Sequence, residues 1–229
     1  MRSRSVFRFL GGGAAVGVAA YAAYGLLAWL RYGHLKQCSP KEADPLLDWF
    51  MPKYDVVARH TISIEVPAEV ALAAACDMSF DRSIIIRATF KTRELVLGGR
   101  AGSHVFAGGL LEQMKRIGWS QIADVPGREI VMGSATQPWR PNPTFLTLTP
   151  EQFESFHAPG YVKIIWNLRA DPLTSATCVF RTETRVLACG SAARSKFRRY
   201  WAFLSPGIIL IRIALLRQLK ASALRKFSA

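Results

Sequence analysis

Few side chains in this sequence could take part in chemistry, and His60 is the most promising of them. It is the one titratable residue on a clearly apolar face of a predicted strand. Histidine can act as a general acid or base, but such chemistry needs a second group beside it. Asp124 and Glu129 fall at the ends of a predicted hairpin, and His104 and His157 fall in predicted loops. We therefore expect no catalytic residue, with His60 as the base if the protein is an enzyme.

Sequence motifs for metals and cofactors do not occur either. The four cysteines form no CxxC pair and have no histidine at a metal-ligand spacing. The glycine-rich segment 98–109 contains neither GxxxxGKS, GxxxxGKT nor GxGxxG, so it is typical of a loop rather than of a phosphate-binding turn. The nucleophile motif GxSxG does not occur in the chain. We expect no metal and no cofactor.

The net charge of +14 comes from the two ends of the chain. Residues 1–41 carry six basic residues and residues 190–229 carry nine, and neither segment contains an acid. Between them, 16 acids meet 15 basic residues, so the middle of the chain has a net charge of −1. A nucleic-acid surface needs Lys and Arg spread over the folded domain, whereas cations beside apolar helices suit an anionic lipid surface. We expect the lipid bilayer as a partner and no nucleic acid.

An uncharged segment of 22 residues, residues 9–30, lies between Arg8 and Arg31. A helix of that length measures about 33 Å and can cross a hydrocarbon core of about 30 Å. Its apolar run continues past the small residues around Tyr21, where a signal peptide would be cleaved. We therefore predict that residues 1–32 form a retained, single-pass membrane anchor. A cleaved signal peptide is the alternative.

The segment and the charges beside it add two further expectations. The three arginines ahead of it are clustered more tightly than the three basic residues behind it, which favours a domain outside the cytoplasm. Gly13 and Gly17 form a small-xxx-small pair that could support a helix-mediated homodimer.

Residues 33–54 form a predicted connector, punctuated by three prolines, with a short helix at 46–50.

Residues 55–226 form one predicted α+β domain. A strand at 55–66 ends at Pro67, which begins an alanine-rich helix at 68–76, and a second helix follows at 80–92. Further strands are predicted at 119–125, 129–136, 161–169 and 177–187, with a short helix at 150–156. One face of the last two strands is apolar, which predicts a half-solvated antiparallel sheet. The polar face carries Lys163, Asn167, Arg169, Arg181, Glu183 and Arg185.

The closing helix is predicted at residues 191–226. From Phe197 to Leu219 its apolar residues recur at spacings of three or four, which predicts a stripe packed on the sheet. Pro206-Gly207 predicts a kink, and Arg212 interrupts the apolar run 208–216. A stretch so short and so interrupted is poor material for a second membrane span, so we expect a domain helix.

The order of these elements resembles the helix-grip fold of the START/Bet v 1-like (SRPBCC, polyketide cyclase/lipid-transport) superfamily, over residues 55–225. The resemblance rests on Ile64-Glu65-Val66-Pro67-Ala68-Glu69-Val70, where a strand runs straight into a helix. It rests also on the late strand Arg181-Thr182-Glu183-Thr184-Arg185-Val186 and on the ensuing helix with Phe197-Arg198-Arg199-Tyr200-Trp201. The chain looks like a bacterial branch with an N-terminal membrane anchor. The resemblance implies a curved antiparallel sheet wrapped on the long C-terminal helix.

The resemblance also implies an apolar cavity between sheet and helix, in which relatives hold lipids, sterols, polyketides or aromatic compounds. Such pockets are mostly apolar with a few placed polar groups. The expected lining residues, of which the first and the two threonines are polar, are His60, Ile62, Ile64, Val162, Ile164, Trp166, Leu168, Phe180, Thr182, Thr184, Ile208, Ile211 and Leu215.

Three functions agree with this pattern. The favoured one is a membrane-anchored binder or carrier of a hydrophobic small molecule or lipid. The alternatives are a cyclase- or hydrolase-type enzyme that uses the same cavity, and a structural or interaction module of a membrane assembly.

Overall fold

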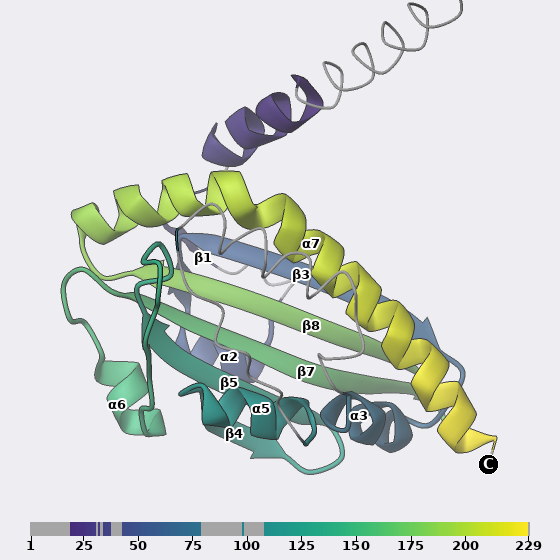
Figure 1. The fold of residues 1–229 in the computed structure, drawn as a ribbon. Helices are drawn as coiled ribbons and strands as arrows, with labels where there is room; N and C mark the ends of the chain where they lie inside the picture. Colours follow the sequence, from purple (N-terminus) through teal and green to yellow (C-terminus); the bar gives the residue numbers. More distant parts are fainter. Residues whose placement is uncertain are drawn as a thin grey trace, which may run out of the picture.

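Six antiparallel strands form one curved sheet in the computed structural model (Figure 1). The structure describes residues 19–30, 32, 34–37, 43–78, 98 and 108–228. The strand order is β3-β8-β7-β5-β4, with β6 paired to β5. The bounds are β3 (Val56–Ile64), β4 (Ser120–Val125), β5 (Glu129–Thr136), β6 (Phe145–Leu146), β7 (Val162–Thr174) and β8 (Thr177–Ala188). A separate two-stranded sheet consists of β1 (Lys36–Gln37) and β2 (Lys53–Tyr54).

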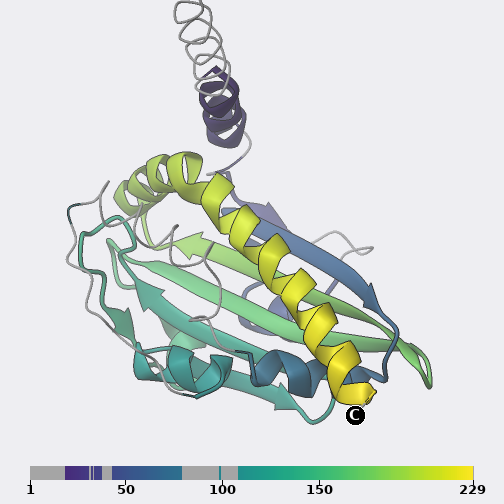
Figure 2. The ribbon, with the colours of Figure 1, turned by 45° about the vertical axis from the view of Figure 1, so that its right-hand side comes forward.

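Helices cover both faces of the large sheet. The long helix α7 (Ser191–Phe227) crosses one face diagonally, and α3 (Ala68–Cys76) and α5 (Leu110–Arg116) pack on that same face (Figure 2). The opposite face is covered by α2 (Pro45–Phe50) and α6 (Pro150–Ser155). The predicted α+β fold, with an antiparallel sheet gripping a long C-terminal helix, is confirmed.

Local chemistry accounts for several of the element boundaries. Pro67 lies at the N-cap of α3, where its missing N–H costs no helical hydrogen bond. Thr149 and Gln152 form a reciprocal capping box at the start of α6. Gly127 has φ of +70° in the turn between β4 and β5, a backbone conformation that favours glycine. The predicted hairpin therefore forms where the sequence places it.

The strand register brings the predicted inward-facing residues onto one face. His60 pairs with Thr182, and Ile62 pairs with Phe180. Trp166 pairs with Thr184 on the other side of β8. Side chains alternate along each strand, so this register sets one apolar face against α7. We call it the inner face.

The expectation of a half-solvated outer face is wrong, because α2 and α6 cover this face of the sheet. Lys163, Asn167 and Arg185 are no more than 2% exposed. Apolar side chains of α2, α6 and the outer face form a buried cluster: Leu47, Met51, Tyr54, Ile122, Val131, Phe153 and Ile165. Segment 44–54 was expected to be a polar connector, but it packs as the outer layer of the domain. The division of the chain into anchor, connector and domain otherwise stays a prediction.

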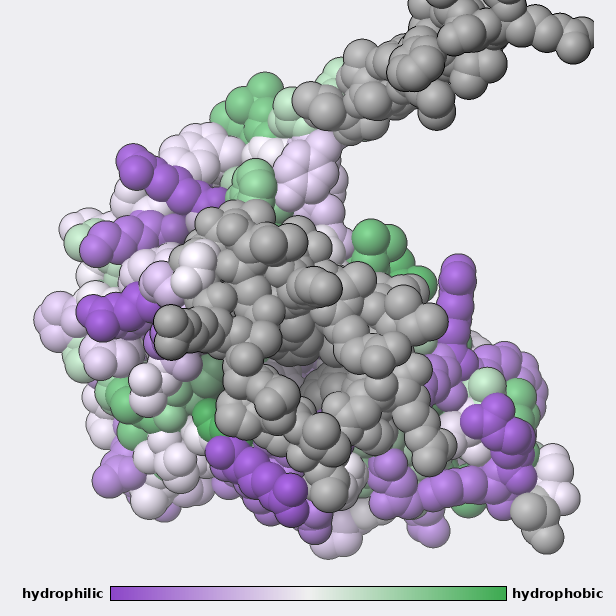
Figure 3. Space-filling model, viewed as in Figure 1, coloured by the Kyte–Doolittle hydropathy of each residue, from purple (hydrophilic) through white to green (hydrophobic). Residues whose placement is uncertain are grey.

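The helix Ala19–Leu30 contacts the first half of α7, at residues 198–205. Arg198 donates from Nε to the carbonyl oxygen of Trp29 at 2.7 Å, and its guanidinium lies 4.3 Å from the centroid of that indole ring. Tyr21 donates to the carbonyl of Phe203. Tyr24 Oη lies 3.3 Å from the Ser205 hydroxyl. In the space-filling view, hydrophilic side chains gather where α7 begins, and hydrophobic ones lie where this helix meets the domain (Figure 3).

Among the described residues, α7 is a helix long enough and apolar enough to cross a membrane, judged by its length and composition alone. It packs on the sheet through Phe197 and Trp201 near its start and through Leu216, Leu219 and Ala223 near its end. The helix bends, with Pro206 inside it (Figure 1). The helix Ala19–Leu30 is apolar but shorter than a full span.

Several sequence expectations lie outside the described residues. They are segment 9–18 of the predicted anchor with Gly13 and Gly17, the predicted helix at 80–92, and most of the glycine-rich segment 98–109. Membrane insertion, helix pairing and the side of the membrane therefore stay predictions.

Candidate ligand-binding site

A cationic side chain lies at the centre of the contact between α7 and the inner face. Arg212 donates from Nη1 to Thr182 Oγ1 at 3.0 Å and from Nη2 to Thr184 Oγ1. The two threonines are two residues apart on β8, so both hydroxyls point from the same face of the strand. His60 is the strand partner of Thr182 on β3. The three polar residues that were predicted from sequence therefore meet around one arginine.

The charge of Arg212 has no carboxylate partner within the part of the chain that the structure describes. Arg212 keeps part of its surface exposed, and desolvation of its guanidinium lowers the pKa to about 10, so the side chain is still cationic at pH 7. A guanidinium has five N–H donors, and the two hydroxyls accept from only some of them. Neutral hydroxyl groups compensate a desolvated charge poorly. The site thus has unused donor capacity and an excess positive charge.

His60 adds an unsatisfied polar atom beside this charge. Its Nδ1 atom is buried and has no hydrogen-bond partner. Burial, and then the positive charge of Arg212, lower the pKa of His60 from its usual value. The imidazole is therefore neutral at pH 7, and one ring nitrogen is available to a further partner.

Apolar side chains surround this polar centre. The predicted lining residues that are buried are Ile64, Val162, Trp166, Leu168, Phe180, Thr182 and Thr184. Those that keep part of their surface exposed are His60, Ile62, Ile164, Ile208, Ile211 and Leu215. The structure brings the apolar members other than Ile211 into two neighbouring clusters, and Ile164 packs against both of them. Ligand binding by these residues stays a prediction.

Arg212 is the residue that sequence reasoning missed. It was taken as an interruption of the apolar helix, but it lies on the sheet-facing stripe itself. Ile208 is four residues before it and Leu215 three residues after it, and both pack toward the sheet. The same spacing that predicted the apolar stripe could therefore have placed Arg212 on the buried side.

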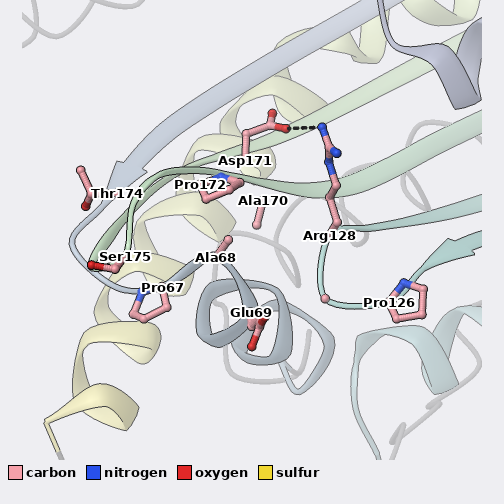
Figure 4. Close-up of a pocket in the computed structure, with 11 residues that line it drawn as sticks. Pro67, Ala68, Glu69, Pro126, Arg128, Ala170, Asp171, Pro172, Thr174 and Ser175 are labelled. Atoms are coloured by element: carbon pink, nitrogen blue, oxygen red, sulfur yellow. Dashed lines mark ion pairs between the residues drawn. The ribbon is translucent and has the colours of Figure 1, made fainter.

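A cleft of about 580 Å³ opens at the far end of the sheet, where the β4–β5 turn, the β7–β8 turn and the start of α3 meet (Figure 4). Arg128 and Asp171 line it and form an ion pair of 3.7 Å. Glu69 lies on α3 at its wall. None of the predicted site residues lines this cleft. Its lining is shared among prolines, small residues and these three charged side chains.

A network of buried charges crosses the outer face, and it too was missed. Asn167 donates from Nδ2 to Asp44 at 2.9 Å and to Glu129 at 2.6 Å. Its Oδ1 accepts from the backbone N–H of Glu183 at 2.7 Å. Arg169 lies 3.3 Å from Asp44 and 3.5 Å from Glu129. Desolvation, reinforced by the neighbouring Asp44 carboxylate, raises the pKa of Glu129 to about 7.

A shifted carboxyl group often marks an active site, but this one is enclosed. Asp44, Glu129 and Asn167 are each no more than 3% exposed. Asp44 also caps α2 by accepting from the N–H of Leu47 at 3.1 Å. The network therefore fastens α2 to the sheet, and a substrate has no route to it through the described residues.

Comparisons with known proteins find distant structural likenesses only. No protein-family model and no curated protein matches the chain. The Zhui aromatase/cyclase of Streptomyces sp. R1128 is 13% identical, with a TM-score of 0.29 over 75% of this chain and 95% of that one. A Nitrosospira multiformis protein is 12% identical, with a TM-score of 0.28 over 66% of this chain and 92% of that one. A hypothetical Helicobacter pylori protein is 6% identical, with a TM-score of 0.28 over 76% and 95%. Because all three TM-scores lie below 0.5, none of them supports a functional argument.

Proposed function

We propose that this protein binds a hydrophobic small molecule or lipid between α7 and the inner face, at a membrane to which its N-terminal helix holds it. The observation that carries the proposal is the uneven closure of α7 on the sheet. Phe197 and Trp201 near the start of the helix, and Leu219 near its end, are at most 4% exposed. Between them, Ile208, Ile211 and Leu215 keep part of their surface exposed.

This incomplete packing is expected of a ligand-binding site and is not expected of a fully packed hydrophobic core. Apolar side chains in protein interiors are normally packed to the density of an organic crystal. On the facing strands, Ile62 and Ile164 also keep part of their surface exposed. Apolar surface left open on both sides of one interface is a surface on which a hydrophobic molecule gains free energy, about 25 cal/mol for each Å² that it covers.

The contacts of the helix Ala19–Leu30 support a position close to lipid. Arg198, Phe203 and Ser205 of α7 all contact this helix, and they lie just ahead of the partly open stretch 208–215. On the side of α7 away from the sheet, Phe203 is 47% exposed and Leu210 is 59% exposed. If residues 9–30 span the bilayer, this exposed surface of α7 lies beside the interface from which a lipid would come.

Native mass spectrometry of the full chain purified in mild detergent tests the proposal. The wild-type protein should carry a lipid or bind added oleyl alcohol in a one-to-one complex. Ile208→Trp should remove that complex because the larger side chain fills the space that the ligand needs. Leu210→Trp is the matched control on the outer side of the same helix, and it should bind as the wild type does.

Thermal melts of both variants should confirm that they fold. A wild-type protein that binds no apolar molecule in several preparations would contradict the proposed function. So would an equal loss of binding in the two tryptophan variants.

A further inference from the structure

We propose that the ligand is an amphiphile with an anionic head group, and that Arg212 is the residue that binds this head group. The inference rests on the proposed function, since it names the chemical class of the molecule that would lie between α7 and the sheet. A carboxylate or a phosphate monoester on an apolar tail has the required chemistry.

Charged residues on the two faces of β8 are organised differently. Glu183 points to the outer face, where it pairs with Arg59 at 2.7 Å and with Arg185 at 2.6 Å. Arg185 is completely buried, and it also pairs with Asp48 at 2.6 Å. The arginines of the outer face, Arg59, Arg169 and Arg185, therefore each have a carboxylate partner. The inner face holds Arg212, for which the described residues supply none.

A desolvated cation is costly unless an anion compensates it, and the cost is largest when all of its neighbours are neutral. The neighbours of Arg212 on β8 are the hydroxyls of Thr182 and Thr184. These two bonds fix the direction of the guanidinium, because both acceptors lie on the same strand. A planar guanidinium held in this way can offer its remaining N–H groups to two oxygens of one carboxylate or phosphate.

His60 provides an independent observation at the same place. Its Nδ1 atom is buried without a hydrogen-bond partner, although buried polar atoms are nearly always paired in folded proteins. The ring is on the strand beside Thr182, and the charge of Arg212 acts on it. A head group bound to Arg212 could satisfy this nitrogen as well, if the neutral imidazole carries its proton on Nδ1 and donates it to an anionic oxygen.

The apolar residues give the direction of the tail. Ile208 and Leu215 flank Arg212 by one helical turn on either side, and Ile62 and Ile164 face them from β3 and β7. A tail that leaves the head group in either direction along α7 meets partly exposed apolar surface. The combination of one fixed cation and apolar surface on both sides selects an anionic amphiphile over a small inorganic ion or a neutral hydrocarbon.

Competition binding to the full chain in mild detergent, followed by native mass spectrometry, tests this inference. The probes are oleate, oleyl phosphate and oleyl alcohol, which share one tail, and acetate and inorganic phosphate, which have none. Oleate and oleyl phosphate should bind about tenfold more tightly than oleyl alcohol, or better, because a charge-assisted hydrogen bond is stronger than a neutral one. Acetate and phosphate should bind weakly, since they cover no apolar surface.

Arg212→Gln should bring the three oleyl probes to the same affinity, and Arg212→Lys should keep part of the preference because it keeps the charge. Arg217→Gln is the matched control, since Arg217 is an exposed arginine of the same helix. Its preference for the anionic probes should equal that of the wild type.

The outcomes separate the two proposals. Equal affinities of the wild type for oleate, oleyl phosphate and oleyl alcohol would overturn the anion site and leave the proposed function standing. Failure of all three to bind would overturn the proposed function itself. If acetate or phosphate bound as tightly as the oleyl anions, the inference that the ligand has an apolar tail would be overturned. The wild-type comparison needs no variant, so the test stands even if Arg212→Gln does not fold.

Discussion

Asn167 on β7 donates a hydrogen bond of 2.9 Å to Asp44, 123 residues earlier in the chain. Asp44 caps α2, so this bond joins the segment ahead of β3 to the middle strand of the sheet. The same amide group holds Glu129 and the backbone of Glu183. One uncharged side chain thus keeps two carboxylates in place under the outer layer of the domain.

Asn167→Ala should therefore destabilise the protein strongly. The substitution removes one hydrogen bond each from the buried carboxylates of Asp44 and Glu129 and leaves the backbone N–H of Glu183 without its partner. We expect a loss of about 3 kcal/mol in the free energy of unfolding. Urea denaturation followed by circular dichroism would measure it. Asn142→Ala is the control at an exposed asparagine and should change the free energy of unfolding by less than about 0.5 kcal/mol. Similar values for the two variants would show that the network carries little stability.

The stability of the protein should depend on pH through Glu129. Its pKa is raised from 4.5 to about 7 in the folded protein, chiefly by desolvation and then by Asp44. Between these two values the folded protein keeps a proton that the unfolded chain has lost. The free energy of unfolding should therefore fall as pH rises from about 5 to 7, and level off above that.

Glu129→Gln should flatten this slope, because the amide does not titrate. Urea denaturation at several pH values would compare the variant with the wild type. Glu151→Gln, at a fully exposed carboxylate of α6, is the control and should keep the wild-type slope. A wild-type stability that rises from pH 5 to 7 would contradict the role of Glu129.

Arg198→Ala should loosen the N-terminal helix on α7. It removes the hydrogen bond to the Trp29 carbonyl and the cation–π contact with the same residue, together about 1–2 kcal/mol. Spin labels at the exposed positions Leu26 and Leu210 would report the distance between the two helices. Its distribution should broaden in Arg198→Ala. The neighbouring Arg199→Ala, at an exposed residue, should leave it unchanged, and broadening in both would refute the contact.

Arg212→Met should stabilise the protein when no ligand is bound. The variant removes a desolvated cation that has no carboxylate partner among the described residues, and it keeps an unbranched apolar side chain. We expect a gain of about 1 kcal/mol, or roughly 2–4 °C in Tm for a domain of this size. Differential scanning calorimetry of ligand-free protein would measure it. Arg217→Met should leave Tm nearly unchanged, and a large drop for Arg212→Met would assign Arg212 a structural role instead.

The strand and helix pattern of the inner face could be predicted from sequence because it depends on local periodicity. Alternation from Val56 to Ile64 and from Val162 to Leu168 placed the apolar side chains on one face, and Pro67 marked the start of α3. The spacing of Phe197, Trp201 and Leu219 placed α7 on that face. These signals lie within single elements, so no knowledge of distant contacts was needed.

The outer layer could not be predicted in the same way. Asn167 and Arg185 have the residue types of a solvated surface, and their burial depends on α2 and its cap, which lie more than 100 residues away in the sequence. Each of the two is buried because a distant group pairs with it, as Asp48 pairs with Arg185. Lys163 is covered by α6 instead, where it donates to the carbonyl oxygen of Glu154 at 2.9 Å. Arg212 was missed for a different reason. Its position was predictable from the helical period, but its charge was taken as evidence of exposure.

Photo-crosslinking with a diazirine-bearing fatty acid tests the central claim of a ligand between α7 and the sheet most directly. The full chain would be labelled in lipid nanodiscs, digested and mapped by mass spectrometry. A ligand in this place should give labels on residues 204–219 of α7 and on the facing strands β3, β7 and β8, suppressed by excess oleate and absent in Ile208→Trp. Labels confined to the helix Ala19–Leu30, or labels on α7 that excess oleate does not reduce, would contradict it.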